Sequence, residues 1–213
     1  MKKKWPFPDI IIATGNIHKL KQFQELFGRY LHLKVKGLKD LPEMPEIDED
    51  QDTFEGNARK KAEIISQRLN APVVSDDSGL VVPALNGEPG VYSARYAGEN
   101  ATDEENNRKL LQRIAPIPPS RRKAYYVCAM ALSVPNEPTK IVRGECEGVI
   151  TSQPRGNQGF GYDPVFFLPS HMKTMAELSN QQKFAISHRG KATRLLIEEM
   201  KKAYHFNNEG GKS

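Results

Sequence analysis

The chain has 213 residues, of which 38% are hydrophobic and 27% are charged, a composition typical of a globular protein with one sizeable domain or two small lobes. Its 31 Lys and Arg against 26 Asp and Glu give a net charge of +5, which permits anionic partners such as nucleotides or nucleic acid without choosing between them. No run approaches the ~18 apolar residues that cross a bilayer, and two isolated cysteines, Cys128 and Cys146, favour a reducing cytoplasm over a disulfide scaffold. We therefore expect a cytoplasmic protein with no membrane partner.

The first part of the chain predicts alternating strands and helices. Apolar patterning favours strands at 9–13 and 31–35 and a helix at 18–30, with an acidic, Pro-containing loop over 41–52. Thr53 is a suitable N-cap for a helix that runs to Leu69. Two short strands, 73–75 and 80–82, are expected on either side of an Asp-Asp-Ser-Gly turn.

The second part of the chain begins with a long Gly- and Pro-rich loop over 86–100 and a helix over 103–114. The prolines of 116–119 mark the expected boundary between two lobes. Two long strands, 124–134 and 140–150, follow, then a glycine-rich loop at 156–161, a helix at 191–204 and a disordered tail from Asn207. The fold class is thus α/β, with a long mixed sheet flanked by helices and a cleft.

Thr14-Gly-Asn-Ile-His-Lys19 lies where a strand is expected to give way to a helix. Amides at a helix N-terminus, together with a hydroxyl and a lysine, suit phosphate oxygens. The segment has too few glycines for a Walker loop or a dinucleotide fingerprint. A plain strand-to-helix turn with a surface lysine fits the same residues.

Asp76 and Asp77 stand between two apolar segments. Adjacent carboxylates repel one another, and burying them without a partner is costly. A divalent cation such as Mg²⁺ relieves both problems, and one of the two acids could take a proton from water. An Asx-rich turn is the alternative interpretation.

An acidic run and a helical pair could complete such a site. Glu46-Ile-Asp-Glu-Asp50 offers a further carboxylate, although most charge runs are solvated loops. Asn57 and Lys61 are one helical turn apart, so they share a face that could point into a cleft. A surface lysine is the simpler interpretation of Lys61.

Two later motifs combine polar and aromatic side chains. Gly159-Phe-Gly-Tyr-Asp-Pro164 places aromatics between glycines, which suits a flat ring stacked on one face. Ser187-His-Arg-Gly190 groups three polar side chains that could donate hydrogen bonds to a carbonyl oxygen. A strand-end turn and a helix-capping loop are the respective alternatives.

Six motifs together, in this order, closely resemble the inosine triphosphate pyrophosphatase family over about residues 10–200. They are Thr14-Gly-Asn16 with Lys19, Thr53-Phe54 with Asn57-Ala58 and Lys61-Ala62, Asp76-Asp-Ser-Gly-Leu80, Gly87 with Pro89-Gly-Val-Tyr-Ser-Ala-Arg-Tyr-Ala-Gly98, Gly159-Phe-Gly-Tyr-Asp-Pro164 and Ser187-His-Arg-Gly190. The resemblance implies one elongated α/β domain over 1–213, with two lobes around a central cleft, and a homodimer. It also implies Mg²⁺-dependent hydrolysis of ITP, dITP and XTP to the monophosphate and pyrophosphate.

The resemblance further implies roles for individual residues. Asp77 would be the general base, and Glu49, Asp76 and Asp77 would bind the metal. The implied substrate-binding residues are Thr14, Gly15, Asn16, Lys19, Lys61, Ser78, Phe160, Gly161, Tyr162, Asp163, Lys183, Ser187, His188 and Arg189. Two departures from the family pattern are His18, where relatives have a small residue, and Asp50-Gln51, where they commonly have Thr-Gly.

Two rival functions fit parts of the same sequence. A pyrophosphatase for other modified nucleoside triphosphates would share the phosphate chemistry but not the base pocket. A nucleic-acid-binding module would use the positive charge, but the basic residues are scattered and cluster at Arg121-Arg-Lys123 without interleaved aromatics. We therefore expect a nucleotide substrate and no nucleic-acid partner.

Overall fold

The computed structural model describes residues 2–15, 17–41 and 47–206, without the side chains of residues 18 and 19. Within these residues the helices are α1 Ile17–Leu31, α2 Phe54–Leu69, α3 Asp103–Ile114, α4 Asn180–Ile186 and α5 His188–Ala203. The strands are β1 Lys3–Lys4, β2 Asp9–Ile12, β3 Lys34–Gly37, β4 Val73–Val81, β5 Lys123–Ser133, β6 Lys140–Ile150, β7 Phe166–Leu168, β8 Lys173–Thr174 and β9 Tyr204–His205. None of the helices in these ranges has the length and apolar character needed to cross a membrane.

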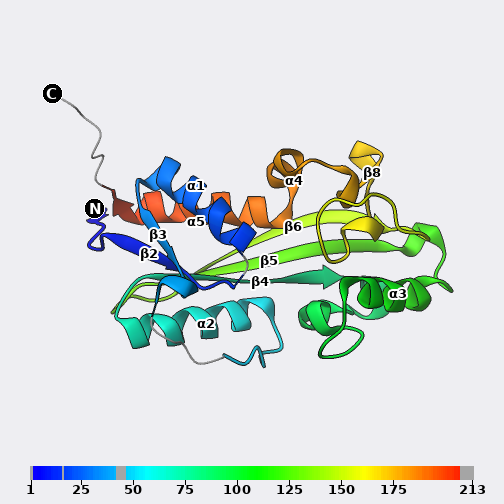
Figure 1. The fold of residues 1–213 in the computed structure, drawn as a ribbon, viewed down its shortest axis with the longest axis horizontal. Coiled ribbons are helices and arrows are strands. Elements are labelled where there is room, and N and C mark those ends of the chain that lie inside the picture. Colours follow the sequence, from blue (N-terminus) through cyan, green and yellow to red (C-terminus); the bar gives the residue numbers. More distant parts are fainter. Residues whose placement is uncertain (1, 16, 42–46, 207–213) are drawn as a thin grey trace. The chain divides into compact units, whose positions relative to one another are not determined.

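One mixed sheet contains seven of these strands, in the order β3-β2-β4-β5-β6-β7-β8 (Figure 1). Strand β2 pairs in parallel with both β3 and β4, whereas β7 pairs antiparallel with β6 and β8. Parallel pairing requires long crossovers, which α1 and α2 provide. The predicted α/β class with a mixed sheet flanked by helices is confirmed.

The chain divides into two compact units. The first is drawn from residues 1–77, 129–142 and 192–213, and the second from 78–128 and 143–191. The boundary expected at 116–119 is wrong, because this segment lies inside the second unit. There Ile117 packs against the apolar cluster of that unit, so the prolines mark a turn on one core.

In the first unit, helices cover both faces of the sheet. Figure 1 shows α2 on one face of β4 and α1 on the other. Helix α2 approaches β4 closely because Ala58 and Ala62 are fully buried and lack bulky side chains. The Ser75 hydroxyl of β4 donates to the Ala58 carbonyl. This contact fixes the register between α2 and β4.

Helix α2 begins and ends as its sequence predicts. The Thr53 hydroxyl accepts a hydrogen bond of 3.0 Å from the Gly56 amide, which satisfies one of the unpaired donors of the first turn. Asn70 ends the helix in the left-handed conformation, with φ of 46°, a conformation that asparagine tolerates well. The predicted cap at Thr53 is confirmed, and Leu69, the last apolar residue of the predicted pattern, is the last residue of the helix.

Strand β4 differs from its prediction. Residues 73–81 form one continuous strand, not two short strands around a turn. Gly79 and the two aspartates favour a turn by local propensity, but pairing of β4 within the sheet overrides that preference. Asp76 and Asp77 therefore lie inside a strand, and the Asx-turn interpretation is wrong.

The second unit has an apolar core of its own. Its buried cluster includes Leu80 of β4, Leu110 and Ile114 of α3, and Phe166 of β7. Helix α3 has the predicted bounds, and its N-terminus carries a capping box between Thr102 and Glu105. This core supports the loop that precedes β7.

Smaller differences occur at element ends. Strand β3 begins at Lys34, three residues after its predicted start, and α4 was not predicted at all. Helix α5 begins at His188 instead of Lys191, because Ser187 caps it: its hydroxyl accepts from the Gly190 amide at 3.1 Å. The predicted tail from Asn207 lies outside the described residues.

Candidate active site

The predicted site residues fall into two sets, one in each unit. The first-unit set is Thr14, Gly15, Asn16, Lys19, Glu49, Lys61, Asp76 and Asp77, and the second-unit set is Ser78, Phe160, Gly161, Tyr162, Asp163, Lys183, Ser187, His188 and Arg189. Asn16 and the side chain of Lys19 lie outside the described residues. Thr14 is half-buried and Gly15 is exposed, directly after β2. Phosphate binding by these residues thus stays a prediction, and only Thr14 and Gly15 can be located in the structure.

Asp77 is held by helix α2. It is 8% exposed, and its Oδ2 accepts a 3.0 Å hydrogen bond from the Asn57 amide. The Oδ1 of Asn57, itself 2% exposed, accepts from the Gln51 amide at 2.9 Å. One buried asparagine therefore fixes the carboxylate and also anchors the loop that precedes α2.

The two aspartates do not share a face of β4. Successive side chains of a strand point to opposite faces. Ser75 and Asp77, two residues apart, both contact α2, so Asp76 points to the other face. Asp76 is 6% exposed, so neither carboxylate points into bulk solvent. The two carboxylates therefore do not lie on the same face of β4, and the role of Asp76 as a metal ligand stays a prediction.

Lys61 lies one turn after Asn57 on the same face of α2. Its ammonium forms an ion pair with Glu49 and donates to the Asp76 carbonyl at 3.4 Å. The exposed fractions of the two side chains in this pair are 17% for Lys61 and 33% for Glu49. The prediction that Asn57 and Lys61 share one face of α2 is confirmed, because both side chains contact β4.

We expect Asn57→Ala to lower the free energy of unfolding by about 2 kcal/mol, because it removes the shared partner of the Gln51 amide and the buried Asp77 carboxylate. Turnover should fall as well, since Asp77 loses its support. Chemical denaturation and steady-state kinetics measure the two effects. Asn106→Ala is the matched control: Asn106 is equally buried and bridges the Ala97 amide and the Ala94 carbonyl in the second unit. An equal loss of turnover in both folded variants would contradict a specific role for Asn57.

The donor set around α2 fits a hard divalent cation. Mg²⁺ binds in proteins through one or two carboxylates, with water and phosphate oxygens completing its shell. Glu49 and Asp77 are carboxylates held on the same side of β4, by Lys61 and Asn57 respectively. Among the described residues no group of three or more His, Cys, Asp or Glu is placed to hold a metal by itself. The substrate would therefore have to supply further ligands.

In the second unit, a buried ion pair organises the site. The Lys183 ammonium donates to Asp163 Oδ2 at 2.8 Å and to the Gln158 carbonyl at 3.1 Å. Asp163 Oδ1 accepts from the Tyr126 hydroxyl at 3.1 Å. Burial raises the pKa of the Asp163 carboxyl, while the hydrogen bonds from Lys183 and Tyr126 oppose that rise. Both carboxylate oxygens thus have fixed donors.

The glycine loop before Asp163 is held by the first turns of α3. The Gly161 amide donates to Asp103 Oδ2 at 2.6 Å, and the Gly161 carbonyl accepts from Asn107 at 2.8 Å. Phe160, between the two glycines, is 57% exposed, and the Arg189 guanidinium lies 5.5 Å from its ring centre. The loop therefore presents an exposed aromatic ring beside a cation.

The remaining predicted residues of the second unit differ in their surroundings. The His188 ring stacks on Tyr126 with centres 4.7 Å apart and planes 14° apart. The Tyr162 hydroxyl donates to the Ser93 carbonyl at 2.8 Å, so Tyr162 points into the core. Ser187 caps α5, as the capping interpretation expected. Ser78 is half-buried in β4.

Three residues of this arrangement were missed from the sequence. Asp103 and Asn107 hold Gly161, and Tyr126 holds Asp163. The first two lie in an ordinary amphipathic helix, where polar residues predict an exposed face. Tyr126 lies in an apolar strand, and its hydroxyl was the available signal, since a buried tyrosine usually finds a hydrogen-bond partner.

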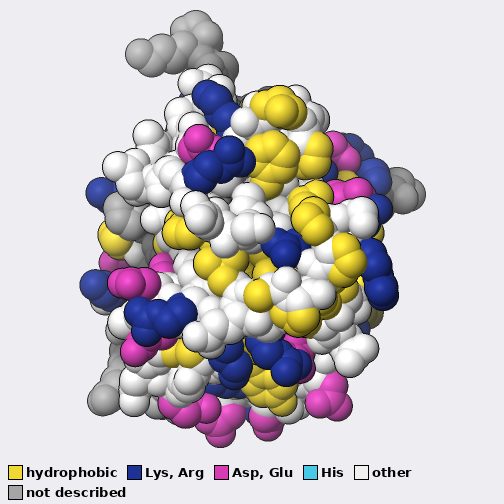
Figure 2. All heavy atoms as spheres, turned by 90° about the vertical axis from the view of Figure 1, so that its right-hand side faces the viewer, with side chains coloured by type: hydrophobic (Ala, Val, Ile, Leu, Met, Phe, Trp, Pro, Cys, Tyr) yellow, Lys and Arg dark blue, Asp and Glu magenta, His cyan; other side chains and the backbone are white. Residues whose placement is uncertain are grey.

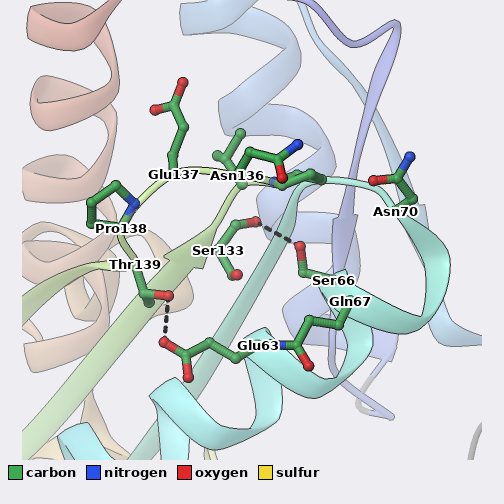
Figure 3. A pocket seen from close by; sticks show the side chains of 11 residues that line it. Glu63, Ser66, Gln67, Asn70, Ser133, Asn136, Glu137, Pro138 and Thr139 are labelled. Atoms are coloured by element: carbon green, nitrogen blue, oxygen red, sulfur yellow. Dashed lines mark hydrogen bonds between the residues drawn. The ribbon is translucent and has the colours of Figure 1, made fainter.

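A separate cavity of about 400 Å³ lies in the first unit, between the end of α2 and the turn from β5 to β6 (Figure 3). Its polar side chains already pair with one another: Thr139 donates to Glu63 at 2.6 Å, and Ser66 donates to the Ser133 carbonyl at 3.4 Å. None of the predicted site residues lines it. We therefore do not assign the chemistry to this cavity.

Within the basic cluster at 121–123, Arg121 and Lys123 are exposed but Arg122 is buried. Arg122 is 7% exposed and donates to the Ile117 carbonyl and the Ser152 hydroxyl, both at 2.8 Å. Figure 2 shows Lys and Arg side chains in separate groups, with acidic and apolar side chains between them. This arrangement does not favour a nucleic-acid surface, which gathers basic residues on one face.

The fold and the two residue sets define a class of protein: an α/β protein with buried carboxylates and a lysine on one unit and an aromatic, cationic loop on the other. Comparison with known proteins specifies the family. The Ham1 family model matches residues 10–199, and the chain belongs to the Ham1 family. This assignment confirms the resemblance found in the sequence.

Individual relatives agree with this assignment. A Bacillus cereus protein named dITP/XTP pyrophosphatase is 51% identical over 193 residues, which cover 90% of this chain and 94% of the relative. A Geobacillus kaustophilus protein of the same name is 49% identical over 191 residues, which cover 90% and 93%. The structure of a Ham1 protein from Coxiella burnetii matches with a TM-score of 0.87 and 42% identity, covering 92% of this chain and all of that one.

Proposed function

We propose that this protein hydrolyses deaminated purine nucleoside triphosphates (ITP, dITP and XTP) to the monophosphate and pyrophosphate. The observation that carries this proposal is the buried Asp77 carboxylate, held by Asn57 one helical turn from Lys61. A carboxylate and a lysine in this arrangement suit attack by water on a phosphorus atom. Membership of the Ham1 family and relatives named dITP/XTP pyrophosphatase support the choice of substrate.

The chemical problem is attack on an α-phosphorus surrounded by negatively charged oxygens. Asp77, oriented by Asn57, takes the proton of the attacking water and is the proposed general base. Lys61 offsets charge on the phosphate oxygens as pyrophosphate leaves. Thr14, Gly15, Asn16, Lys19 and Ser78 are the remaining residues proposed to bind the triphosphate.

We propose Mg²⁺ as the cofactor, with Glu49 and Asp77 as its protein ligands. The predicted role of Asp76 as a third ligand is not favoured, because Asp76 points to the opposite face of β4. When bound, the cation supplies Lewis-acid stabilisation of the phosphate oxygens and of the departing pyrophosphate. In the structure, Glu49 is paired with Lys61, so the chain itself holds this carboxylate in place. Lys61 remains available to phosphate oxygens if the cation takes over the Glu49 carboxylate.

Apart from Ser78, the second-unit set is proposed to read the purine base. Phe160 offers an exposed ring for stacking, with Gly161 and Tyr162 shaping its loop. Lys183 has three N–H donors, two of which contact Asp163 and Gln158. The third suits the O6 oxygen of hypoxanthine or xanthine, together with donors from Ser187, His188 and Arg189. Adenine has an amino group at that position, and two donors facing each other are costly.

A substrate panel tests the function. We expect ITP, dITP and XTP to be cleaved with kcat/KM at least about 100-fold above that for ATP, because a base contact based on hydrogen bonds discriminates strongly. Products are the monophosphate and pyrophosphate, resolved by ion-exchange chromatography. EDTA should abolish turnover, and added Mg²⁺ should restore it. Release of diphosphate and phosphate, or turnover unaffected by EDTA, would contradict the proposal.

The same substrate panel distinguishes the alternative function from the proposed one. A pyrophosphatase for other modified nucleoside triphosphates would prefer a pyrimidine substrate over ITP.

The homodimer and the cytoplasmic location expected from the sequence stay predictions. Light scattering after gel filtration tests the dimer, with a mass near twice the 24.0 kDa of the chain as the expected result.

A further inference from the structure

Tyr126 connects two of the groups proposed to read the base. It lies on β5, is 7% exposed, and donates its hydroxyl hydrogen bond to Asp163 Oδ1 at 3.1 Å. Its ring lies between Phe166, at 4.4 Å, and His188, at 4.7 Å between centres. The ring is therefore fixed by packing on both sides, so the hydroxyl is delivered to one oxygen of Asp163.

The hydroxyl of Tyr126 stays protonated at neutral pH. Burial, and then the nearby negative charge of Asp163, raise the pKa of Tyr126 well above its usual value. The residue is thus a permanent donor to the carboxylate. Because Asp163 Oδ2 accepts from Lys183, Asp163 is held from both ends, and its position determines where the Lys183 ammonium lies.

We infer that Tyr126 is a positioning residue for purine selectivity, which acts on the base through Asp163 and Lys183. The inference rests on the proposed function, since it deepens the role of the second-unit set. Tyr126 has no proposed contact with the substrate. Its hydroxyl instead limits the movement of the carboxylate, so that the ammonium faces the O6 position with a defined direction.

The direct test is Tyr126→Phe, which keeps the ring between Phe166 and His188 and removes the hydroxyl. We expect KM for ITP to rise about tenfold, with kcat within about twofold, because a hydrogen bond to a charged group contributes roughly that factor. The ratio of kcat/KM for ITP over ATP should fall by a similar factor. Circular dichroism and thermal melting check that the variant folds.

Tyr96→Phe is the matched control. Tyr96 belongs to the same buried cluster, and its hydroxyl also donates to a carboxylate, Glu88, at 2.7 Å. Both variants lose one hydroxyl–carboxylate hydrogen bond, so both should lose some stability. KM and selectivity should change in Tyr126→Phe alone. Equal KM and selectivity in the two variants would overturn the inference while leaving the function intact.

A double-mutant cycle with Lys183→Met separates positioning from general support. If Tyr126 acts through Asp163 and Lys183, Tyr126→Phe changes KM by less than about twofold when Lys183 is already replaced. Additive effects would show that Tyr126 supports the fold in general and would overturn the inference. Failure of the wild-type protein to cleave ITP is a different outcome, since it rejects the proposed function itself.

Discussion

Asp77→Asn is expected to lower kcat for ITP by about 10³-fold, the contribution typical of a general base. Asparagine has nearly the same shape as aspartate, but its neutral amide does not take a proton from water. The buried position, 8% exposed, and the hydrogen bond from Asn57 leave the carboxylate little freedom. A water molecule from bulk solvent therefore does not easily accept the proton in place of the Asp77 carboxylate.

The binding of ITP separates a catalytic role from a structural one. We expect the Kd for ITP, measured by isothermal titration calorimetry, to change much less than kcat, because Lys61 and the base-reading residues are intact. Asp9→Asn is a suitable control, since Asp9 lies on the neighbouring strand β2 and pairs with Lys36 at 2.5 Å. Its turnover should be near normal. Near-normal turnover of a folded Asp77→Asn variant would remove Asp77 from the role of base.

Much of the fold follows from local patterns in the sequence. Helix α2 was predicted with its cap at Thr53 and its apolar positions through Leu69, because capping chemistry and apolar spacing agree there. The same was true of α3, with its capping box. Strand β4 was mistaken for two strands and a turn, because an Asp-Asp-Ser-Gly segment favours a turn unless neighbouring strands pair with it.

The candidate site was predicted unevenly for a related reason. Asn57 and Lys61 could be placed on one face from helical spacing, and the structure gives that face its partners, Asp77 and Glu49. The opposite directions of Asp76 and Asp77 follow from the strand, which was not predicted there. Contacts such as Tyr126 with Asp163 join residues 37 positions apart, and no local pattern contains that information.

Gly159→Ala is expected to reduce kcat/KM for ITP by about a hundredfold. Gly159 has a φ of +96°, and a Cβ added there would lie well inside van der Waals distance of Asp163 Oδ2 and Lys183 Nζ. Asp163 Oδ2 and Lys183 Nζ each lie at the end of a side chain that could move by itself. Together they form an ion pair whose side chains are only 13% and 12% exposed, so moving either end disturbs a largely desolvated interaction. A single methyl group should therefore displace the Lys183 ammonium, which is proposed to read O6, together with its partner Asp163.

Gly87→Ala distinguishes this clash from backbone strain. Gly87 lies in the same unit with a φ of +89°, and a Cβ there would meet nothing within 4 Å. Both variants force alanine into the left-handed region, at a cost of about 1–2 kcal/mol, so both should melt at lower temperature. Loss of ITP hydrolysis should appear in Gly159→Ala alone, as a rise in KM, because Asp77 and Lys61 belong to the first-unit set and keep their contacts. Equal kinetics in the two variants would show that the Lys183–Asp163 pair does not determine how the base is bound.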